Sequence, residues 1–194
     1  MGFRGVIIDG VRRALGDQSA HHLYAHPDCP ELKLIPRDHQ LSDAIAFRFS
    51  REHNTMTPEQ YISWVKDIPA NENMINIGMD YETFGEHHQK ESGIFTFLEA
   101  LLLGLSRDKQ FRFVTATEAV DEIAAAGPLA TPGYISWADQ ERDVSAWLGN
   151  EMQRDAFDSL SKIENDVKAL LDRNILEQWR ALQTSDHFYY MSTK

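Results

Sequence analysis

The stretch from residue 74 to residue 88, MINIGMDYETFGEHH, most constrains what this chain can fold into. Its first six residues are largely apolar, which predicts a buried strand over residues 74–79. The strand ends abruptly at Asp80, and carboxylates, imidazoles and aromatic rings crowd the positions that follow. Polar groups just beyond the carboxyl end of a buried strand are where barrel and open-sheet enzymes place their chemistry. Asp80 is therefore the first candidate for a catalytic residue.

Other short apolar runs predict further strands over residues 3–8, 45–49 and 111–114. Residues 11–40 are polar and rich in proline, so we expect them to be mostly loop. Helix starts are predicted at Thr57-Pro58 and at Thr115, and residues 94–105 carry Phe95, Leu98, Leu101, Leu102 and Leu105 at helical spacing. This alternation of strands and helices predicts an α/β fold with parallel strands.

The character of the chain changes near Gly127. From Ser136 onward we expect a long helix, since apolar residues between 156 and 170 recur with a 4-3-4-3 spacing, and a last helix around Trp179. We therefore predict two parts. Residues 1–127 would be the C-terminal part of an α/β barrel catalytic domain, and residues 128–194 a helical segment packed on the barrel.

The net charge of −11 argues against nucleic acid or an anionic membrane as a partner and favours a neutral or cationic ligand. No segment approaches the roughly 20 apolar residues of a membrane helix. The single cysteine, Cys29, excludes an internal disulfide and a cysteine-based zinc cluster, and the first residues are not a secretory signal. We expect a cytoplasmic protein.

Asp80 and Glu82 would share one face if the strand continued through both, and like charges that close would raise the pKa of one carboxyl. A solvated acidic loop is the alternative. Glu86, His87 and His88 are residue types that bind metal ions, but adjacent histidines do not readily face one ion, so we expect no metal. One histidine would contact ligand or orient Asp80, and the other would lie on the surface.

Two further regions carry aromatic and charged residues together. Trp137 and Trp147 flank a segment rich in acids, which is typical of carbohydrate sites because sugar faces stack on rings and hydroxyls bind carboxylates. We assign Trp137 to a site and Trp147 to the core. Asp186 and His187 precede three aromatic residues near the end of the chain. No P-loop, G-x-S-x-G or G-x-G-x-x-G motif is present.

Three ordered motifs resemble glycoside hydrolase family 57, a family of archaeal and bacterial α-amylase-type enzymes. They are MDYETFGEH at residues 79–87, SWADQERD with WLGN between residues 136 and 150, and LQTSDHFYY at residues 182–190. The resemblance extends to LSDAIAFRF at residues 41–49 and covers essentially the whole chain. It implies a partial (β/α)7-type barrel followed by a C-terminal helical segment, and retaining hydrolysis or transfer of α-glucans without a cofactor.

The resemblance also implies residue roles. The aspartate at the position of Asp80 is the general acid/base of the family, in agreement with its place after the predicted strand. The expected contacts to an α-glucan or maltooligosaccharide are Glu82, His87, Trp137, Asp139, Asp186 and His187.

The chain departs from the family in one respect: the glutamate nucleophile and an early His-Gln-Pro motif of the family have no counterpart here. A retaining mechanism needs two carboxylates about 5 to 5.5 Å apart, and only one is identifiable. We therefore expect the C-terminal portion of the catalytic region, with the missing N-terminal half or self-association through strand edges near residues 3–8 as possible partners. The alternatives are a catalytically inactive α-glucan-binding or regulatory relic of the family, and a metal-dependent carbohydrate deacetylase.

Overall fold

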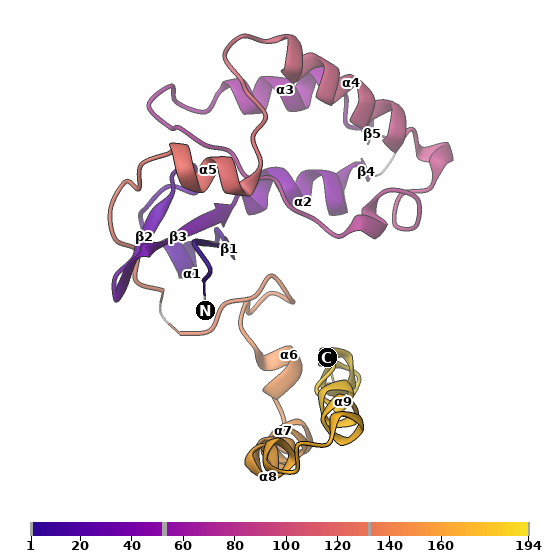
Figure 1. The fold of residues 1–194 in the computed structure, drawn as a ribbon. Helices are drawn as coiled ribbons and strands as arrows, with labels where there is room; N and C mark the ends of the chain where they lie inside the picture. The colour runs from indigo at the N-terminus through magenta and orange to yellow at the C-terminus, as the bar shows by residue number, and fades with distance from the viewer. Residues whose placement is uncertain (1, 52–53, 132, 194) are drawn as a thin grey trace. The chain divides into compact units, whose positions relative to one another are not determined.

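The computed structural model describes residues 2–51, 54–131 and 133–193 (Figure 1). The chain divides into two compact units, Met1–Pro132 and Gly133–Lys194. The first unit combines a small sheet with helices, and the second contains helices and irregular segments. The fold class is therefore α/β, with its strands in the first unit.

The main sheet has three strands in the order β1-β3-β2, formed by β1 (Gly5–Asp9), β2 (Tyr24–His26) and β3 (Cys29–Arg37). β1 confirms the strand predicted near residues 3–8 and runs parallel to β3, with Asp9 opposite Arg37. β2 is antiparallel to β3, so the expectation of parallel strands holds for only one of the two pairings. A short helix, α1 (Arg12–Leu15), connects β1 to the loop before β2.

The prediction that residues 11–40 are mostly loop is wrong, because β2, β3 and α1 all lie there. Pro30 and Pro36 suggested a loop, yet both are within β3. Only Lys33 and Leu34 of β3 pair with a strand on both sides, and neither proline is at one of these two positions. Proline is tolerated away from such positions because its missing N–H breaks no ladder on the unpaired side.

The strand predicted over residues 45–49 is wrong, since this segment belongs to the helix α2 (His39–Arg48) and its C-cap. Asp38 starts the helix, and its side chain accepts a hydrogen bond of 2.8 Å from the Leu41 N–H. Ile45 and Phe49 lie four residues apart on one buried helical face, whereas Phe47 is 57% exposed. The apolar spacing therefore fits a helix as well as a strand. A two-stranded hairpin follows, β4 (Ser50–Arg51) with β5 (Asn54–Thr55), and the predicted end of the strand at Glu52 and His53 lies outside the described residues.

Two predicted helices are confirmed, α3 (Pro58–Lys66) and α4 (Ile94–Arg107), and they lie side by side in Figure 1. Thr57 caps α3 by accepting a hydrogen bond from the Gln60 N–H. The buried stripe of α4 differs from the predicted one, because Phe95 and Leu102 are exposed. It consists of Ile94, Phe97, Leu101 and Leu105. With Tyr61 of α3 and Ile45 and Phe49 of the α2 segment, this stripe forms the main apolar core.

α5 (Ala116–Glu122) begins at Thr115, where the predicted cap is a complete capping box with Glu118. The helix packs against β1. The strand predicted at residues 111–114 does not form in the described structure. An apolar alternation is local, but a strand requires a hydrogen-bonding neighbour, and Phe113 stays exposed.

The second unit contains five helices within its described residues: α6 (Ser145–Leu148), α7 (Glu151–Lys162), α8 (Glu164–Ala169), α9 (Arg173–Leu182) and α10 (Ser185–Tyr189). The predicted last helix is confirmed by α9. The long helix predicted from Ser136 is wrong, because Asp139 and Arg142 have positive φ angles of 56° and 52°. Helix starts instead at the short α6, and the longer α7 starts after Asn150, which forms a capping box with Gln153.

Candidate active site

The segment that leads to Asp80 is extended but is not a strand, which corrects the prediction for residues 74–79. Its backbone is held at separate points rather than by a continuous ladder. The Met74 N–H donates to the His21 carbonyl oxygen at 3.1 Å, and the Asp38 N–H donates to the Asn76 carbonyl oxygen at 2.8 Å. Because Asp38 follows β3 directly, the segment passes the carboxyl end of the sheet before it reaches Asp80.

Two side chains bind both backbone polar groups of Gly78, two residues before Asp80. The Gly78 N–H donates to Ser42 Oγ at 3.1 Å. Arg37 Nε donates to the Gly78 carbonyl oxygen at 2.5 Å. These side chains come from the first turn of α2 and the end of β3. The position of the backbone just before Asp80 is therefore fixed by the end of the sheet and by the helix that follows it.

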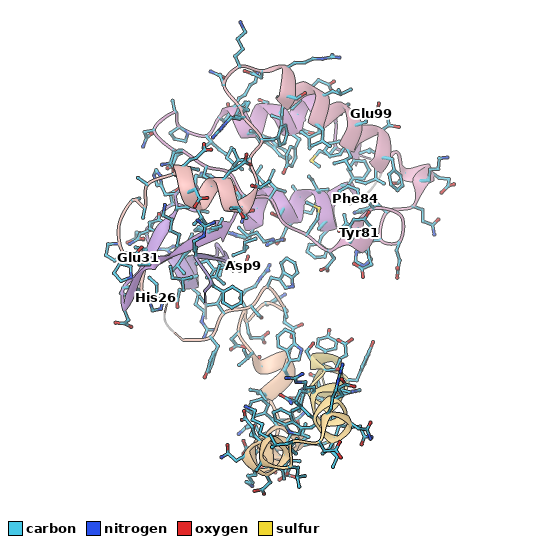
Figure 2. All side chains as sticks on the ribbon, viewed as in Figure 1. Asp9, His26, Glu31, Tyr81, Phe84 and Glu99 are labelled. Carbon is cyan, nitrogen blue, oxygen red and sulfur yellow. The ribbon has the colours of Figure 1, made fainter. Side chains whose placement is uncertain are left out.

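The Arg37 side chain is only 4% exposed and also binds two carboxylates. Its guanidinium donates to Asp9 Oδ1 at 3.0 Å and to Asp43 Oδ1 at 2.7 Å. Asp9 ends β1 and is labelled in Figure 2. Burial of an arginine is costly unless hydrogen bonds and opposite charges compensate for lost water. Arg37 thus ties β1, α2 and the Asp80 segment into one network.

The sequence did not single out Arg37. The available signal was a charged residue placed directly after the apolar run Leu34-Ile35-Pro36, at the carboxyl end of a strand. That strand was predicted as loop, so the position of Arg37 at the end of the sheet was not recognised.

A compact turn follows Asp80 and carries the other predicted residues of this motif. Residues 81–83 form the 3-10 helix η1 (Tyr81–Thr83), so the strand does not continue through Glu82. The expectation that Asp80 and Glu82 share a strand face is therefore wrong. The Glu82 carbonyl oxygen accepts hydrogen bonds from the Glu86 and His87 N–H groups. Figure 2 shows Tyr81 and Phe84 on this turn. Asp80, Glu82 and His87 are all exposed on the same short turn.

The neighbouring histidines differ in their environments. His88 is partly buried, with Nε2 3.0 Å from the Ala46 carbonyl oxygen and its ring packed edge-on against Phe49 at 5.5 Å. His87 is exposed. His88 therefore anchors the turn to the end of α2, and His87 is the histidine that remains accessible to a ligand.

In the second unit, Trp137 and Asp139 lie on a loop that closes on itself. The Ser136 N–H donates to the Arg142 carbonyl oxygen at 3.1 Å, and Arg142 Nη1 donates to the Trp137 carbonyl oxygen at 2.8 Å. Trp137 and Asp139 are both exposed. The loop thus presents an indole and a carboxylate together, which suits a carbohydrate contact.

Asp186 and His187 are exposed on α10, whose Phe188 is buried. The fully buried Gln153 holds this helix in the second unit. Its Nε2 donates to the carbonyl oxygens of Ala146 and Phe188, at 2.7 and 2.9 Å. Its Oε1 accepts from the Gly149 and Asn150 N–H groups. One amide thereby connects α6, α7 and α10.

Within the described ranges, no three histidine, cysteine, aspartate or glutamate side chains gather as a metal would require. Among the helices of the same ranges, none has the length and apolarity needed to cross a membrane.

Comparison with known proteins identifies the family. The family model described as glycosyl hydrolase family 57 matches residues 1–132. The chain belongs to glycosyl hydrolase family 57. A protein of Methanocaldococcus jannaschii named "Putative alpha-amylase" is 40% identical over 207 aligned residues, which cover 100% of this chain and 44% of that protein. The resemblance seen in the sequence is thus confirmed, and this family 57 chain spans less than half the length of its relative.

Proposed function

We propose that this chain supplies the general acid/base, Asp80, of a retaining α-glucan hydrolase built on a (β/α)7-type barrel. Family membership and the name of the archaeal relative support a glycoside hydrolase. The observation that carries the assignment of Asp80 is the binding of both backbone groups of Gly78 by Ser42 and Arg37. An exposed carboxylate on an immobilised backbone is the arrangement that positioned proton transfer requires.

The proposed reaction has two steps. In the first, Asp80 donates its proton to the glycosidic oxygen while the bond from that oxygen to the anomeric carbon breaks. A second carboxylate attacks the anomeric carbon as this bond breaks and forms a covalent glycosyl-enzyme intermediate. In the second step, Asp80 removes a proton from the water that attacks the anomeric carbon, and the nucleophilic carboxylate leaves. Asp80 is thereby returned to its protonated form.

The nucleophilic carboxylate would lie outside these 194 residues, which fits the 44% of the relative's length that the chain covers. The exposed groups on the Asp80 turn, Glu82 and His87, would bind substrate hydroxyls. The second unit would contribute further substrate contacts through Trp137, Asp139, Asp186 and His187.

The test joins this chain to the part of the Methanocaldococcus jannaschii relative that it does not cover. Maltoheptaose hydrolysis is measured for the chain alone, for the joined protein, and for the joined protein with Asp80→Asn. We expect turnover only in the joined protein and a loss of about 10²–10⁴-fold in the variant, the usual contribution of general acid/base catalysis. Full activity of Asp80→Asn would overturn the assignment. Hydrolysis by the chain alone would refute the placement of the nucleophile.

A further inference from the structure

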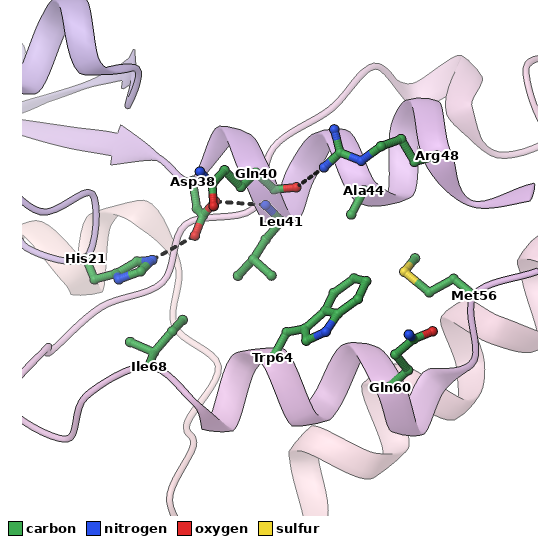
Figure 3. A pocket seen from close by; sticks show the side chains of 10 residues that line it. All are labelled: His21, Asp38, Gln40, Leu41, Ala44, Arg48, Met56, Gln60, Trp64 and Ile68. Carbon is green, nitrogen blue, oxygen red and sulfur yellow. Dashed lines mark hydrogen bonds and ion pairs between the residues drawn. The ribbon is translucent and has the colours of Figure 1, made fainter. Parts of the chain in front are cut away.

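A pocket of about 480 Å³ lies between α2 and α3 in the first unit (Figure 3). Its volume is within the range of about 300–1,000 Å³ typical of small-molecule sites. The lining comes from both helices and from adjoining loop positions: His21, Asp38, Gln40, Leu41, Ala44, Arg48, Met56, Gln60, Trp64 and Ile68. No residue of the Asp80 segment or its turn is among them. The pocket is therefore separate from the proposed catalytic position.

One end of the pocket is a fixed polar pair. His21 Nε2 lies 2.7 Å from Asp38 Oδ2, and the two side chains are only 18% and 10% exposed. Asp38 Oδ1 accepts the Leu41 N–H at 2.8 Å, so the carboxylate is held from both oxygens. Burial alone would raise the pKa of the Asp38 carboxyl, but the hydrogen bonds from His21 and from the Leu41 backbone outweigh it and lower that pKa. Asp38 is thus ionised near neutrality and orients the imidazole.

The opposite wall is apolar and aromatic. Trp64 projects from α3, and its large apolar indole is 40% exposed. Figure 3 shows it facing the side chains of α2 across the pocket. Leu41, Ala44 and Met56 are buried beside it. An exposed indole above a buried apolar base offers a flat surface on which a ring can stack.

The rim carries neutral amides and one guanidinium. Gln40 and Gln60 are exposed, and Arg48 Nη2 donates to the backbone carbonyl oxygen of Gln40 at 2.7 Å, which holds the guanidinium at the pocket. The positive charge of Arg48 is matched by the negative charge of Asp38. A lining with one flat apolar wall, several hydrogen-bonding groups and no excess of either charge suits a neutral polyhydroxylated ring.

We propose that this pocket is a second carbohydrate site, which binds a glucosyl segment of an α-glucan away from Asp80. The sugar ring stacks on Trp64, and its hydroxyls bind Gln60, Arg48 and His21. The identity of the sugar rests on the proposed function. The site would hold one part of an α-glucan polymer on the enzyme while another part of the same polymer reaches the catalytic carboxylate.

The chain contains four tryptophans, so the indole N–H signals of ¹⁵N-labelled protein can resolve the site directly. Trp64→Phe assigns the Trp64 signal, and maltotriose is then titrated into the 194-residue chain. We expect the Trp64 signal to shift in a saturable manner and to shift equally in Asp80→Asn. No shift of this signal at millimolar maltotriose would overturn the proposal. Loss of the shift in Asp80→Asn would place the sugar at the catalytic segment instead.

Calorimetry of maltotriose binding to substituted chains tests the same site independently. Trp64→Ala should weaken maltotriose binding at least tenfold, whereas Phe113→Ala, which removes an exposed aromatic outside the pocket, should leave it unchanged. Gln60→Trp fills the rim from an exposed position and should block binding even if Trp64→Ala fails to fold. Maltotriose binding that survives Gln60→Trp would contradict the location of the site in this pocket. Equally strong binding of cellotriose would contradict the assignment to α-glucans. None of these measurements requires turnover, so a failure here differs from a failure of the proposed function.

Discussion

Arg37 Nε donates a hydrogen bond of 2.5 Å to the carbonyl oxygen of Gly78, two residues before Asp80. The same guanidinium binds Asp9 and Asp43, which lie at the end of β1 and within α2. Elements that are distant in sequence therefore meet at one buried side chain. A catalytic role for Asp80 depends on this network, because the carboxylate itself is exposed and the backbone before it has no strand ladder to hold it.

Arg37→Met should lower the free energy of unfolding by about 3–5 kcal/mol, since it leaves two buried carboxylates without their cation. Urea unfolding followed by circular dichroism measures the change. Arg112→Met is the matched control, because it removes an arginine that pairs with Glu122 at the exposed surface, and it should have no measurable effect. Equal effects of the two substitutions would show that the Arg37 network does not stabilise the unit.

Gly10→Ala should destabilise the junction between β1 and β3. A Cβ at Gly10 would lie 2.3 Å from the Arg37 carbonyl oxygen, and a backbone atom cannot rotate away as a side chain can. Gly2→Ala is the control, because a Cβ there would meet nothing within 4 Å. Thermal unfolding should show a lower midpoint for Gly10→Ala alone. An unchanged midpoint would mean that the backbone at Gly10 is not packed as closely as the structure shows.

The local signals in the sequence predicted several helices correctly, and the reason is physical. Thr57-Pro58 and Thr115 satisfy backbone N–H groups within their own first turns, so a single segment suffices to recognise α3 and α5. Strands depend on distant neighbours. β3 was missed because its pairing with β1 cannot be read from its own residues. The segment before Asp80 was wrongly predicted as a strand for the same reason, since its own residues do not show whether a neighbouring strand is available.

The candidate site was predictable to a similar extent. The motif around Asp80 was visible in the sequence because its chemistry is concentrated in one stretch. The residues that hold it, Arg37 and Ser42, were not visible, because they contribute through contacts that span about forty residues of sequence. The distinction between His87 and His88 likewise required the position of Ala46 and Phe49.

Gln153→Glu should destabilise the second unit. The substitution replaces the NH₂ group that donates to the Ala146 and Phe188 carbonyl oxygens with a buried oxygen that faces them. Unsatisfied buried groups cost about 1–3 kcal/mol each, so we expect a loss of that order in the free energy of unfolding. Gln178→Glu, on an exposed position of α9, is the control. Hydrogen exchange at α10 should accelerate in Gln153→Glu only, and unchanged exchange would contradict the role of Gln153.

The stability of the first unit should depend on pH through Asp38. Burial raises the pKa of the Asp38 carboxyl, but the hydrogen bonds from His21 and Leu41 together outweigh burial, so the pKa is lowered in the folded chain. In the unfolded chain aspartate has a pKa of about 3.9, so as the pH falls this carboxyl takes up its proton in the unfolded chain at a higher pH than in the folded chain. The stabilising contribution is present above about pH 4 and is lost as the pH falls through the folded pKa.

Asp38→Asn keeps a helix-capping side chain but removes this titration. The difference in unfolding free energy between the unsubstituted chain and Asp38→Asn should shrink between pH 6 and pH 3. Asp28→Asn, in the exposed turn between β2 and β3, serves as the control. A difference that stays constant over this range would contradict the assignment to Asp38.

The most direct test of Asp80 as the general acid/base compares two leaving groups in the joined protein that contains the nucleophile. Maltoheptaose needs protonation of its leaving oxygen, whereas α-maltosyl fluoride releases fluoride without it. Asp80→Asn should lower maltoheptaose hydrolysis by about 10²-fold or more. It should slow cleavage of the fluoride far less, and azide should restore turnover by giving α-maltosyl azide. Equal losses for both substrates without rescue by azide, or no loss for either, would contradict the role of Asp80.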